Sequence, residues 1–482
     1  MKEAYEYQKK ISKNKKKYYG IVYTPVHIVD YINKKCLNRW NKTHPPKVID
    51  FSSGTGVFLL DMAKKISEKY SLNIEEVYDK YIFANDLDIE ATKIFREISG
   101  CNNITNLDGL GVDLTKYDII VGNPPFIKIQ NLDGNIHKKI RSFTWCTKGN
   151  TDLYIAMTQR FFDSGKIFGL ICPNSWIKSE TGSSMVADIL KNRNMYQLID
   201  FRGKKIFKEN TYCSIILGDG TRNNSFIFST DMDALEEEKE YNMISKSEFF
   251  LYDKEIQFIL KINKKEHKIS DFCSLKVGLA TLSDSVYFLP ECITDGQYVI
   301  SKGIKIEESI TKKCYKAGKL SRYDKQVDDR IIFPYDENKK VYSESKMQKE
   351  FPMAYTYLTA NKQTLLNRDK KGCQTKVNDG KMKWYEFGRT QGFSLQDEKI
   401  LISPIVTKKF FHKVNDGLFI SGYCLEMKNK TDMQIVIDAI DSQEFLEWIA
   451  LKGVPKDGGY FSINKKCVES FKFDKKKDKE KF

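Results

Sequence analysis

Between residues 44 and 218, short apolar runs alternate with segments of helical character. Apolar runs of about four to eight residues that are separated by helices are typical of parallel strands buried on both faces of a sheet. The sequence therefore predicts an α/β fold in which helices cover both faces of a doubly wound, mostly parallel sheet. The expected strands are residues 47–51, 81–86, 117–122, 167–172, 196–201 and 213–218.

The pattern changes after about residue 221. An acidic block at 231–240 resembles a connection between domains, and residues 266–482 contain short, irregular strand-like pieces with few clear helices. A chain of 482 residues has room for about two to four domains. We therefore expect a basic lead-in at 1–20, a first domain at 21–240 and a C-terminal α+β domain at 241–482.

Basic residues outnumber acidic ones, because 79 Lys and Arg against 64 Asp and Glu give a net charge of 79 − 64 = +15. Such an excess suggests a polyanionic partner, either nucleic acid or an anionic membrane surface, and solubility alone is the alternative role of an excess that is mostly lysine. The longest apolar runs fall far short of the roughly 20 residues that a spanning helix needs, and the polar N-terminus does not resemble a signal peptide. The eleven cysteines are scattered singly, unlike the close pairs of zinc sites. We expect a reduced, metal-free, cytoplasmic protein.

The first motif is a glycine-rich turn, residues 50–56, which ends the first expected strand and opens a helix. Glycines let a backbone turn tightly and approach a ligand, and the N-terminus of a helix carries a partial positive charge. A dinucleotide site requires a third glycine where Leu59 stands, and the Gly-Lys-Ser/Thr of a phosphate loop is absent. The candidate ligand-binding residues in this turn are Asp50, Ser52, Gly54 and Gly56.

Acidic residues follow the next expected strand. Asp86 lies at its end, 86 − 56 = 30 residues past Gly56, where an α/β nucleotide site places a carboxylate for the ribose hydroxyls. Asp88 is a second candidate, with the N-cap of the next helix as its alternative role. Asp108, with an apolar neighbour suited to the edge of a base, is a third candidate, and an Asx turn before Gly109 is its alternative role.

The third motif is Asn123-Pro124-Pro125-Phe126, directly after an apolar strand. Two prolines fix a rigid turn, because each locks φ and neither donates a backbone hydrogen bond. The side-chain oxygen of Asn123 and the carbonyl of Pro124 are then acceptors that converge on one point, with an aromatic ring beside them. This arrangement suits a planar exocyclic amine, whose two N–H groups are accepted while Phe126 stacks on its ring.

An Asn-Pro-Pro-aromatic motif downstream of an acidic Gly-x-Gly turn resembles the amino-methyltransferases that use S-adenosylmethionine. Gly56 and Asn123 are 123 − 56 = 67 residues apart, and about 240 residues follow the catalytic region. This order resembles the gamma class of DNA N6-adenine methyltransferases from restriction–modification systems. Three further segments match motifs of that class: Tyr23-Thr24-Pro25, which matches its upstream cofactor motif, and residues 152–156 and 171–176.

The resemblance implies a Rossmann-like methyltransferase fold with S-adenosylmethionine as cofactor. It implies that residues 241–482 form a target-recognition domain, since residues 276–281 and 384–389 look like specificity-domain segments. Residues 206–215 resemble the segment whose aromatic stacks on the flipped base, so Phe207 and Phe126 would hold that base from two sides; core packing is the alternative role of Phe207. The implied catalytic residues are Asn123, Pro124, Pro125 and Phe126, and the implied cofactor-binding residues are Tyr23, Thr24, Asp50, Ser52, Gly54, Gly56, Asp86, Leu87, Asp108, Gly109 and Asn123.

The expected partner is duplex DNA, with no membrane, and the expected state is a monomer. About 20 residues precede Thr24, too few for a nuclease domain, so a separately encoded restriction endonuclease is expected to perform any cleavage. Other interpretations remain open: methylation of RNA or of a protein glutamine, N4-cytosine methylation, which more often goes with Ser before Pro-Pro, and a catalytically inactive DNA-binding specificity subunit.

Overall fold

The computed structural model divides into two compact units, residues 1–256 and 257–482. It describes residues 2–475 except 13, 16–18, 129–131, 133, 148, 150, 178, 180, 208–210, 247, 326, 370–371, 390, 394–396, 407–409 and 457–459. No helix among the described residues is both long enough and apolar enough to cross a membrane.

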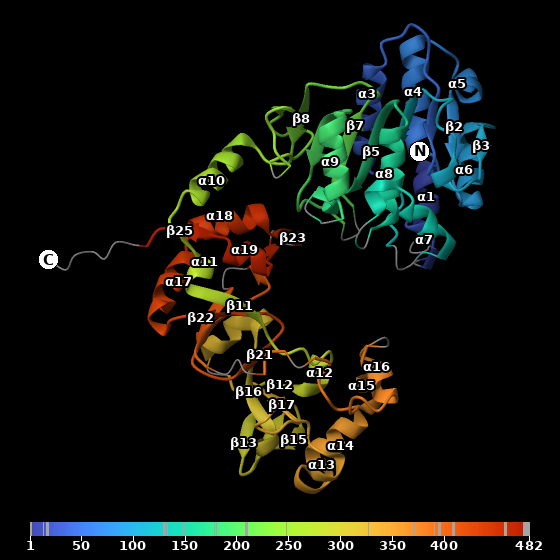
Figure 1. Cartoon of the computed structure of the whole chain (residues 1–482). Coiled ribbons are helices and arrows are strands. Elements are labelled where there is room, and N and C mark those ends of the chain that lie inside the picture. The colour runs from blue at the N-terminus through green and yellow to red at the C-terminus, as the bar shows by residue number, and fades with distance from the viewer. Residues whose placement is uncertain are drawn as a thin grey trace, which may run out of the picture. The chain divides into compact units, whose positions relative to one another are not determined.

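A nine-stranded sheet forms the centre of the first unit (Figure 1). Its first five strands are mutually parallel, so the mostly parallel sheet that the apolar runs predicted is confirmed. The strand order is β3 (Ile104–Thr105), β2 (Ile82–Asn85), β1 (Val48–Asp50), β4 (Ile119–Gly122), β5 (Ile167–Pro173), β7 (Cys213–Gly218), β6 (Met195–Asp200), β8 (Ser225–Ser229) and β9 (Glu237–Glu240).

Helices cover both faces of this sheet. Successive strand residues point to opposite faces, and Ile49 and Ile120 accordingly belong to one hydrophobic core while Val48 and Ile119 belong to another. Each core is completed by its own helices, which makes the unit a three-layer sandwich. The first core contains α8 (Leu153–Asp163) and α9 (Ser183–Asn192), and the second contains α3 (Val26–Arg39) and α4 (Val57–Tyr70). The other helices of this unit are α1 (Lys2–Lys10), α5 (Ile74–Lys80), α6 (Ile89–Ser99) and α7 (Gly134–Arg141).

One expected strand runs opposite to the prediction. β7 is antiparallel to both of its neighbours, β5 and β6, because the chain returns from β6 as a hairpin and inserts between them. All six of its residues are buried. A strand that is buried on both faces shows the same continuous apolar run in either direction, so this sequence pattern cannot reveal its orientation.

The composition of residues 231–240 indicated a connection between domains, but in the structure this acidic block belongs to the first unit. Its last four residues form β9, the edge strand of the sheet, paired antiparallel with β8. Within β9, Lys239 is buried and pairs with Glu237 at 2.6 Å. Charged side chains are a common protection for an exposed sheet edge, which accounts for the composition. The first unit ends after residue 256, inside α10 (Asp253–Asn263), whereas the expected domain boundary was at 240.

The N-terminal segment packs against the first unit. Ala4 of α1 is fully buried in the same core as α3 and α4, and its carbonyl accepts a hydrogen bond from the Thr55 hydroxyl. Tyr5 donates its hydroxyl proton to the carbonyl of Thr24 at 2.6 Å. The described part of the expected lead-in therefore supports the glycine-rich turn and the segment before α3; Lys13 and residues 16–18 lie outside the described residues.

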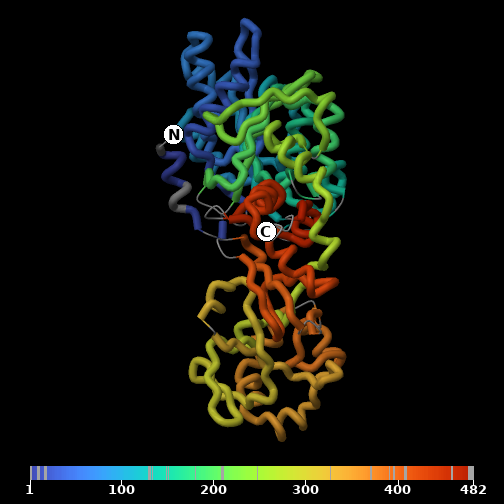
Figure 2. The backbone as a smooth tube through the Cα atoms, turned by 90° about the vertical axis from the view of Figure 1, so that its left-hand side faces the viewer, coloured from blue at the N-terminus to red at the C-terminus, as the bar shows by residue number. Residues whose placement is uncertain are grey.

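Besides a small buried cluster that includes Tyr315, Leu401 and Phe419, the second unit contains two large hydrophobic cores. One includes residues from the beginning and end of its sequence, which β11 and β22 join as an antiparallel pair, and the other lies in the middle of its sequence. Figure 2 shows the corresponding arrangement, with the yellow-to-orange middle segments together and the red C-terminal segments beside the start of the unit. The strands are β10 (His267–Lys268), β11 (Cys273–Val277), β12 (Phe288–Leu289), β13 (Ile293–Asp295), β14 (Tyr298–Ser301), β15 (Ile304–Glu307), β16 (Thr311–Lys316), β17 (Arg330–Ile332), β18 (Lys399–Ile402), β19 (Ile405–Val406), β20 (Phe411–Val414), β21 (Leu418–Ile420), β22 (Tyr423–Met427), β23 (Val454–Lys456), β24 (Tyr460–Ser462) and β25 (Lys472–Phe473).

Helices are more frequent in this unit than the sequence indicated. Most of them are shorter than three turns, so the 3.6-residue periodicity that identifies a helix has little length in which to appear. They are α11 (Ile269–Phe272), α12 (Asp284–Tyr287), α13 (Glu344–Glu350), α14 (Pro352–Ala360), α15 (Lys362–Asn367), α16 (Cys373–Asn378), α17 (Met433–Ile440), α18 (Gln443–Lys452) and α19 (Lys465–Glu469).

Candidate functional site

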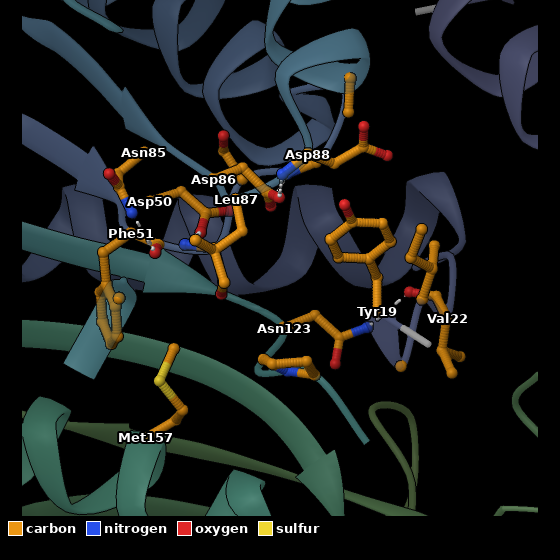
Figure 3. A pocket seen from close by; sticks show the side chains of 18 of the residues that line it. Tyr19, Val22, Asp50, Phe51, Asn85, Asp86, Leu87, Asp88, Asn123 and Met157 are labelled. Carbon is orange, nitrogen blue, oxygen red and sulfur yellow. Dashed lines mark hydrogen bonds between the residues drawn. The ribbon is translucent and has the colours of Figure 1, made fainter. Parts of the chain in front are cut away.

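A cavity of about 630 Å³ lies at the carboxyl ends of the central strands of the first unit. The strand order reverses between β1 and β4, because β2 and β3 extend to one side and β5 to the other. In an open α/β sheet, ligands bind in the crevice at such a reversal. Four continuous stretches contribute to the lining, residues 19–24, 50–55, 85–88 and 108–110, and the turn after β4 adds Asn123 and Pro125 (Figure 3).

Asp50 lies at the end of β1 with 2 % of its surface exposed. Burial and the neighbouring carboxylate of Asp86 raise the pKa of Asp50 to about 8. Its Oδ1 accepts a hydrogen bond from the backbone N–H of Ser52 at 2.9 Å. A Cβ at Gly122 would lie 2.7 Å from the same oxygen, so only glycine lets the end of β4 pass this carboxylate.

Asp86 joins the end of β2 to the glycine-rich turn. Its Oδ2 accepts from the N–H of Gly54 and its Oδ1 from the N–H of Asp88, both at 2.8 Å. Burial raises the pKa of Asp86 against the effect of these two bonds. A carboxylate offers about four lone-pair directions, so a ligand that enters the cavity still finds acceptor capacity on Asp86.

Asp88 is the N-cap of α6, because its side chain accepts from the backbone N–H of Glu90 at 3.2 Å. The capping role suggested for this residue is thereby confirmed. Asp88 also pairs with Lys15, whose Nζ lies 2.9 Å from Oδ1. Asp88 therefore links the start of α6 to the N-terminal segment.

Asp108 forms the Asx-type turn that was its alternative role, with Oδ1 accepting from the N–H of Leu110 at 3.0 Å. It also lines the cavity, and its Oδ2 lies 2.5 Å from Nζ of Lys139. Next to it, a Cβ at Gly109 would lie 2.9 Å from the carbonyl oxygen of Phe51, so glycine brings this turn against the end of β1. The turn function and a place in the cavity wall are therefore compatible.

The two glycines of the Gly-x-Gly turn have different surroundings. Gly54 has a φ of +53° and lines the cavity, and nothing within 4 Å would meet a Cβ there. Gly56 has a φ of +75°, and a Cβ there would lie 2.1 Å from the Phe95 ring of α6. Gly56 is not among the described residues that line the cavity, and its place in the fold is explained by helix packing.

Asn123 occupies the end of β4 with its amide in a defined orientation (Figure 3). Its Nδ2 donates to the carbonyl oxygen of Val22 at 3.0 Å and to the hydroxyl oxygen of Thr24 at 3.1 Å. The carbonyl of Val22 can only accept, so the amide nitrogen must face it. Oδ1 therefore points the other way, and among the described residues this buried oxygen has no hydrogen-bond partner.

The aromatic residues Phe126 and Phe207 contact each other edge to face, with ring centroids 6.2 Å apart and an interplanar angle of 71°. Neither they nor Pro124 belong to the described lining of the cavity. Phe207 is 5 % exposed and packs in the core that contains α3 and α4, as its alternative role required. The structure thus brings the two rings together; residues 208–210 of the same segment lie outside the described residues.

The two motif segments at 152–156 and 171–176 lie beside the Asn-Pro-Pro-Phe turn. Leu153, at the start of α8, donates its N–H to the carbonyl of Ile127 at 2.9 Å. Tyr154 and Ser175 share a hydrogen bond of 2.8 Å between their hydroxyl groups. Segments from three parts of the sequence therefore surround the end of β4.

Two features of the site were missed from the sequence. Asn85 is fully buried, and its Nδ2 donates to the carbonyls of Phe51 and Leu107, which ties three strand ends together. Gly20 has a φ of +64° and accepts from the N–H of Phe126 at 3.2 Å. Asn85 precedes Asp86 in the motif and could have been found as a buried polar residue at a strand end, whereas no sequence signal marked Gly20.

Among the described residues, no group of three or more His, Cys, Asp or Glu side chains is arranged to hold a metal ion. The polar groups of the cavity are instead carboxylates, backbone amides and the Asn123 amide.

The Eco57I restriction-modification methylase family matches residues 58–207. The Type II methyltransferase M.BanIII of Aneurinibacillus aneurinilyticus is 24 % identical over 514 residues, which cover 90 % of this chain and 85 % of that protein. The Type II restriction enzyme and methyltransferase RM.Eco57I of Escherichia coli is 24 % identical over 70 % of this chain, and the match spans 38 % of its length. The structure of the Type IIL restriction-modification enzyme MmeI in complex with DNA is similar in fold, with a TM-score of 0.65, 12 % identity, and coverage of 97 % of this chain and 70 % of that one.

These findings confirm the resemblance to restriction–modification methyltransferases that the motifs indicated. The family model matches residues 58–207, a range that includes Asp86, Asp108 and the Asn-Pro-Pro-Phe turn.

Proposed function

We propose that this protein transfers a methyl group from S-adenosylmethionine to the N6 amino group of an adenine flipped out of duplex DNA, as the modification enzyme of a restriction–modification system. The observation that carries the proposal is the Oδ1 of Asn123, a buried acceptor without a partner among the described residues, at the edge of a cavity lined by carboxylates. The relatives named as Type II methyltransferases support the reaction class.

The cavity fits the proposed cofactor. Its volume of about 630 Å³ is within the usual range for small-molecule sites. Asp86 offers acceptor capacity for ribose hydroxyls, and Asp50 offers a carboxylate to an amino group. Leu87 and Met157 line the cavity and provide apolar surface for a base. When bound, the cofactor supplies a methyl group on a positively charged sulfur, so the transfer itself needs no metal ion.

Asn123 and Pro124 activate the adenine amino group that receives the methyl group. An adenine amino group is a poor nucleophile, because its lone pair is delocalised into the ring. In this proposal, its two N–H groups donate to Oδ1 of Asn123 and to the carbonyl of Pro124, which directs the lone pair toward the methyl group. Pro125 keeps the turn rigid. The contribution of the protein is then positioning and electrostatics, the usual means of accelerating group transfer.

A base inside a duplex cannot reach this turn, so the target must leave the helix, which costs about a few kcal/mol. Stacking on an aromatic ring returns roughly 1–3 kcal/mol per base. We assign this role to Phe126 and Phe207, whose edge-to-face contact must open to admit the base. The net charge of +15 provides phosphate contacts, so binding should weaken steeply with salt.

The test is to express the chain in cells that lack other adenine methyltransferases and to sequence their DNA by a method that detects modified bases. The expected result is N6-methyladenine at one recurring sequence, absent from cells that express Asn123→Ala. Modified cytosine at that sequence, or modification of RNA or protein without DNA, would assign a different acceptor. Unmodified nucleic acid and protein would indicate an inactive specificity subunit.

A further inference from the structure

Residues 19–24, here called the strap, lie between the N-terminal helix and α3 and form one wall of the cavity. The strap contacts the Asn-Pro-Pro-Phe turn through backbone atoms, because the N–H of Phe126 donates to the carbonyl of Gly20. A Cβ at Gly20 would lie 2.8 Å from the nitrogen of Phe126. The close approach of these two backbones therefore depends on glycine.

The strap also holds the side chain of the residue on which the proposed chemistry depends. Both partners of the Asn123 amide nitrogen, the carbonyl of Val22 and the hydroxyl of Thr24, belong to the strap. Each N–H of the amide is thereby occupied, and a rotation that exchanged oxygen for nitrogen would place Oδ1 against the Val22 carbonyl. Two acceptors that face each other repel, so the strap selects the orientation in which Oδ1 is left for a ligand.

Thr24 is itself held in place by a hydrogen bond from the N-terminal helix. It is 2 % exposed, and its carbonyl accepts the hydroxyl proton of Tyr5 in α1 at 2.6 Å. Tyr5 is not among the described residues that line the cavity. The chain Tyr5–Thr24–Asn123 therefore runs from the N-terminal helix to the acceptor oxygen through two hydrogen bonds.

We propose that Thr24 is a positioning residue for methyl transfer, which holds the Asn123 amide so that Oδ1 can accept a proton of the target amine. The inference rests on the proposed function. The same strap walls the cavity, so Thr24 orients the acceptor oxygen beside the space in which the cofactor would bind. This role is distinct from any contact that Thr24 makes with the cofactor.

The test compares Thr24→Val with Thr24→Ser in the full chain. Valine keeps the shape and removes the hydroxyl acceptor, whereas serine keeps the hydroxyl. We expect Thr24→Val to lower kcat by about 10- to 100-fold, the range found when a catalytic group is slightly misplaced, while cofactor affinity by calorimetry changes less than about threefold. Thr24→Ser should retain at least about a third of the kcat. Tyr5→Phe, outside the cavity, should lower kcat by a few-fold.

Thr92→Val is the matched control. Thr92 is 3 % exposed, and its hydroxyl accepts from the Asn106 side-chain amide at 2.9 Å, but it does not belong to the described cavity lining. Its replacement should affect thermal stability without lowering kcat. A readout independent of activity is the Asn123 side-chain amide resonance in ¹⁵N-asparagine-labelled protein, assigned by its loss in Asn123→Asp. Its protons should exchange faster with water in Thr24→Val than in the parent or in Thr24→Ser.

Asn123→Ala, assayed in parallel, separates the two claims. If Asn123→Ala is inactive while Thr24→Val retains the parental kcat and amide exchange rate, the positioning role is wrong and the proposed function stands. If Thr24→Ser, which keeps the hydroxyl, is as impaired as Thr24→Val, the hydrogen bond from Asn123 to that hydroxyl does not account for the loss, which also overturns the inference. If Asn123→Ala remains fully active, the proposed function fails.

Discussion

The two halves of the cavity are held together differently. At the ends of β1 and β2, the carboxylates of Asp50 and Asp86 accept hydrogen bonds from backbone amides of the loops that directly follow those strands. At the end of β4, Asn123 donates to a segment about 100 residues earlier in the chain and leaves its own oxygen open. The carboxylate half is built locally, and the acceptor half depends on the strap.

This difference has a chemical consequence. Local backbone hydrogen bonds hold the carboxylates in place whether or not a ligand is present, which suits a site that must bind first. The acceptor oxygen takes its orientation from two hydrogen bonds between Asn123 and the strap, so its loss should act on the transfer step rather than on binding. Mutations in the two halves should therefore affect different kinetic constants.

The largest expected effect is that of Asn123→Ala, which removes the acceptor oxygen. We expect kcat to fall by about 100- to 1,000-fold, comparable to the loss of a main electrostatic group in other active sites. Cofactor affinity should change by less than about threefold, because the carboxylate half is untouched. Transfer of tritiated methyl groups to DNA and calorimetry with S-adenosylmethionine measure the two quantities. A parallel loss of affinity would show that the halves are not separable.

Asp86→Ala should produce the opposite pattern. It removes the acceptor for Gly54 and for Asp88, as well as the proposed ribose contact, so we expect cofactor affinity to fall by about 10- to 100-fold. At saturating cofactor, kcat should recover to within about fivefold of the parent. Asp86→Asn keeps one acceptor oxygen, so its cofactor affinity should lie between those of Asp86→Ala and the parent. A variant with normal affinity and low kcat would place Asp86 in the acceptor half instead.

The sequence predicted the carboxylate half well for the same reason that this half is local. A buried apolar run locates each strand, and the polar residue that ends the run lies at the carboxyl edge of the sheet, so Asp50 and Asp86 could be placed at one edge from the sequence pattern. The capping role of Asp88 followed from its position before a helix. The direction of β7 could not be predicted, because its apolar run is the same in both orientations.

The long-range contacts that build the acceptor half could not be predicted from the sequence. Tyr23 and Thr24 were assigned to the cofactor through a motif resemblance, but the bond between Thr24 and Asn123 joins residues 99 positions apart. Only tertiary packing determines such a contact. The same limit applies to Phe207, whose burial against Phe126 depends on how the hairpin between β6 and β7 folds back. The short helices of the second unit lacked the length to show a period.

An effect of up to similar size is expected from pH, because the pKa of Asp50 is raised to about 8 in the cofactor-free protein. The cationic amino group of the cofactor favours the ionised carboxylate, so binding below this pKa must release the proton. Affinity should fall by up to about tenfold per pH unit between pH 8 and pH 6. The Asp50→Asn variant should bind the cofactor more weakly than the parent at pH 8, and its affinity should be nearly independent of pH between pH 8 and pH 6.

The same shift predicts the stability of the cofactor-free protein. The folded state binds the Asp50 proton more tightly than the unfolded chain, where the pKa is near 3.8. Its stabilising contribution is therefore complete below that value and is lost as the pH rises through about 8. The melting temperature of the parent should fall relative to that of Asp50→Asn between pH 5 and pH 9. Parallel curves would contradict the raised pKa.

The smallest effect is expected from Lys15→Ala, which weakens the attachment of the N-terminal segment to the carboxylate half. Lys15 pairs with Asp88 at 2.9 Å and with Glu90 at 2.5 Å, and it donates to the Tyr7 hydroxyl at 2.9 Å. Partly exposed ion pairs contribute about 0–1 kcal/mol, so cofactor dissociation, measured by stopped flow, should accelerate by about two- to fivefold, with a smaller difference at high salt. Lys80→Ala removes a comparable exposed pair with Glu76 in α5, away from the cavity, and should leave that rate unchanged. If both variants behave alike, the N-terminal segment does not restrain the cavity through Lys15.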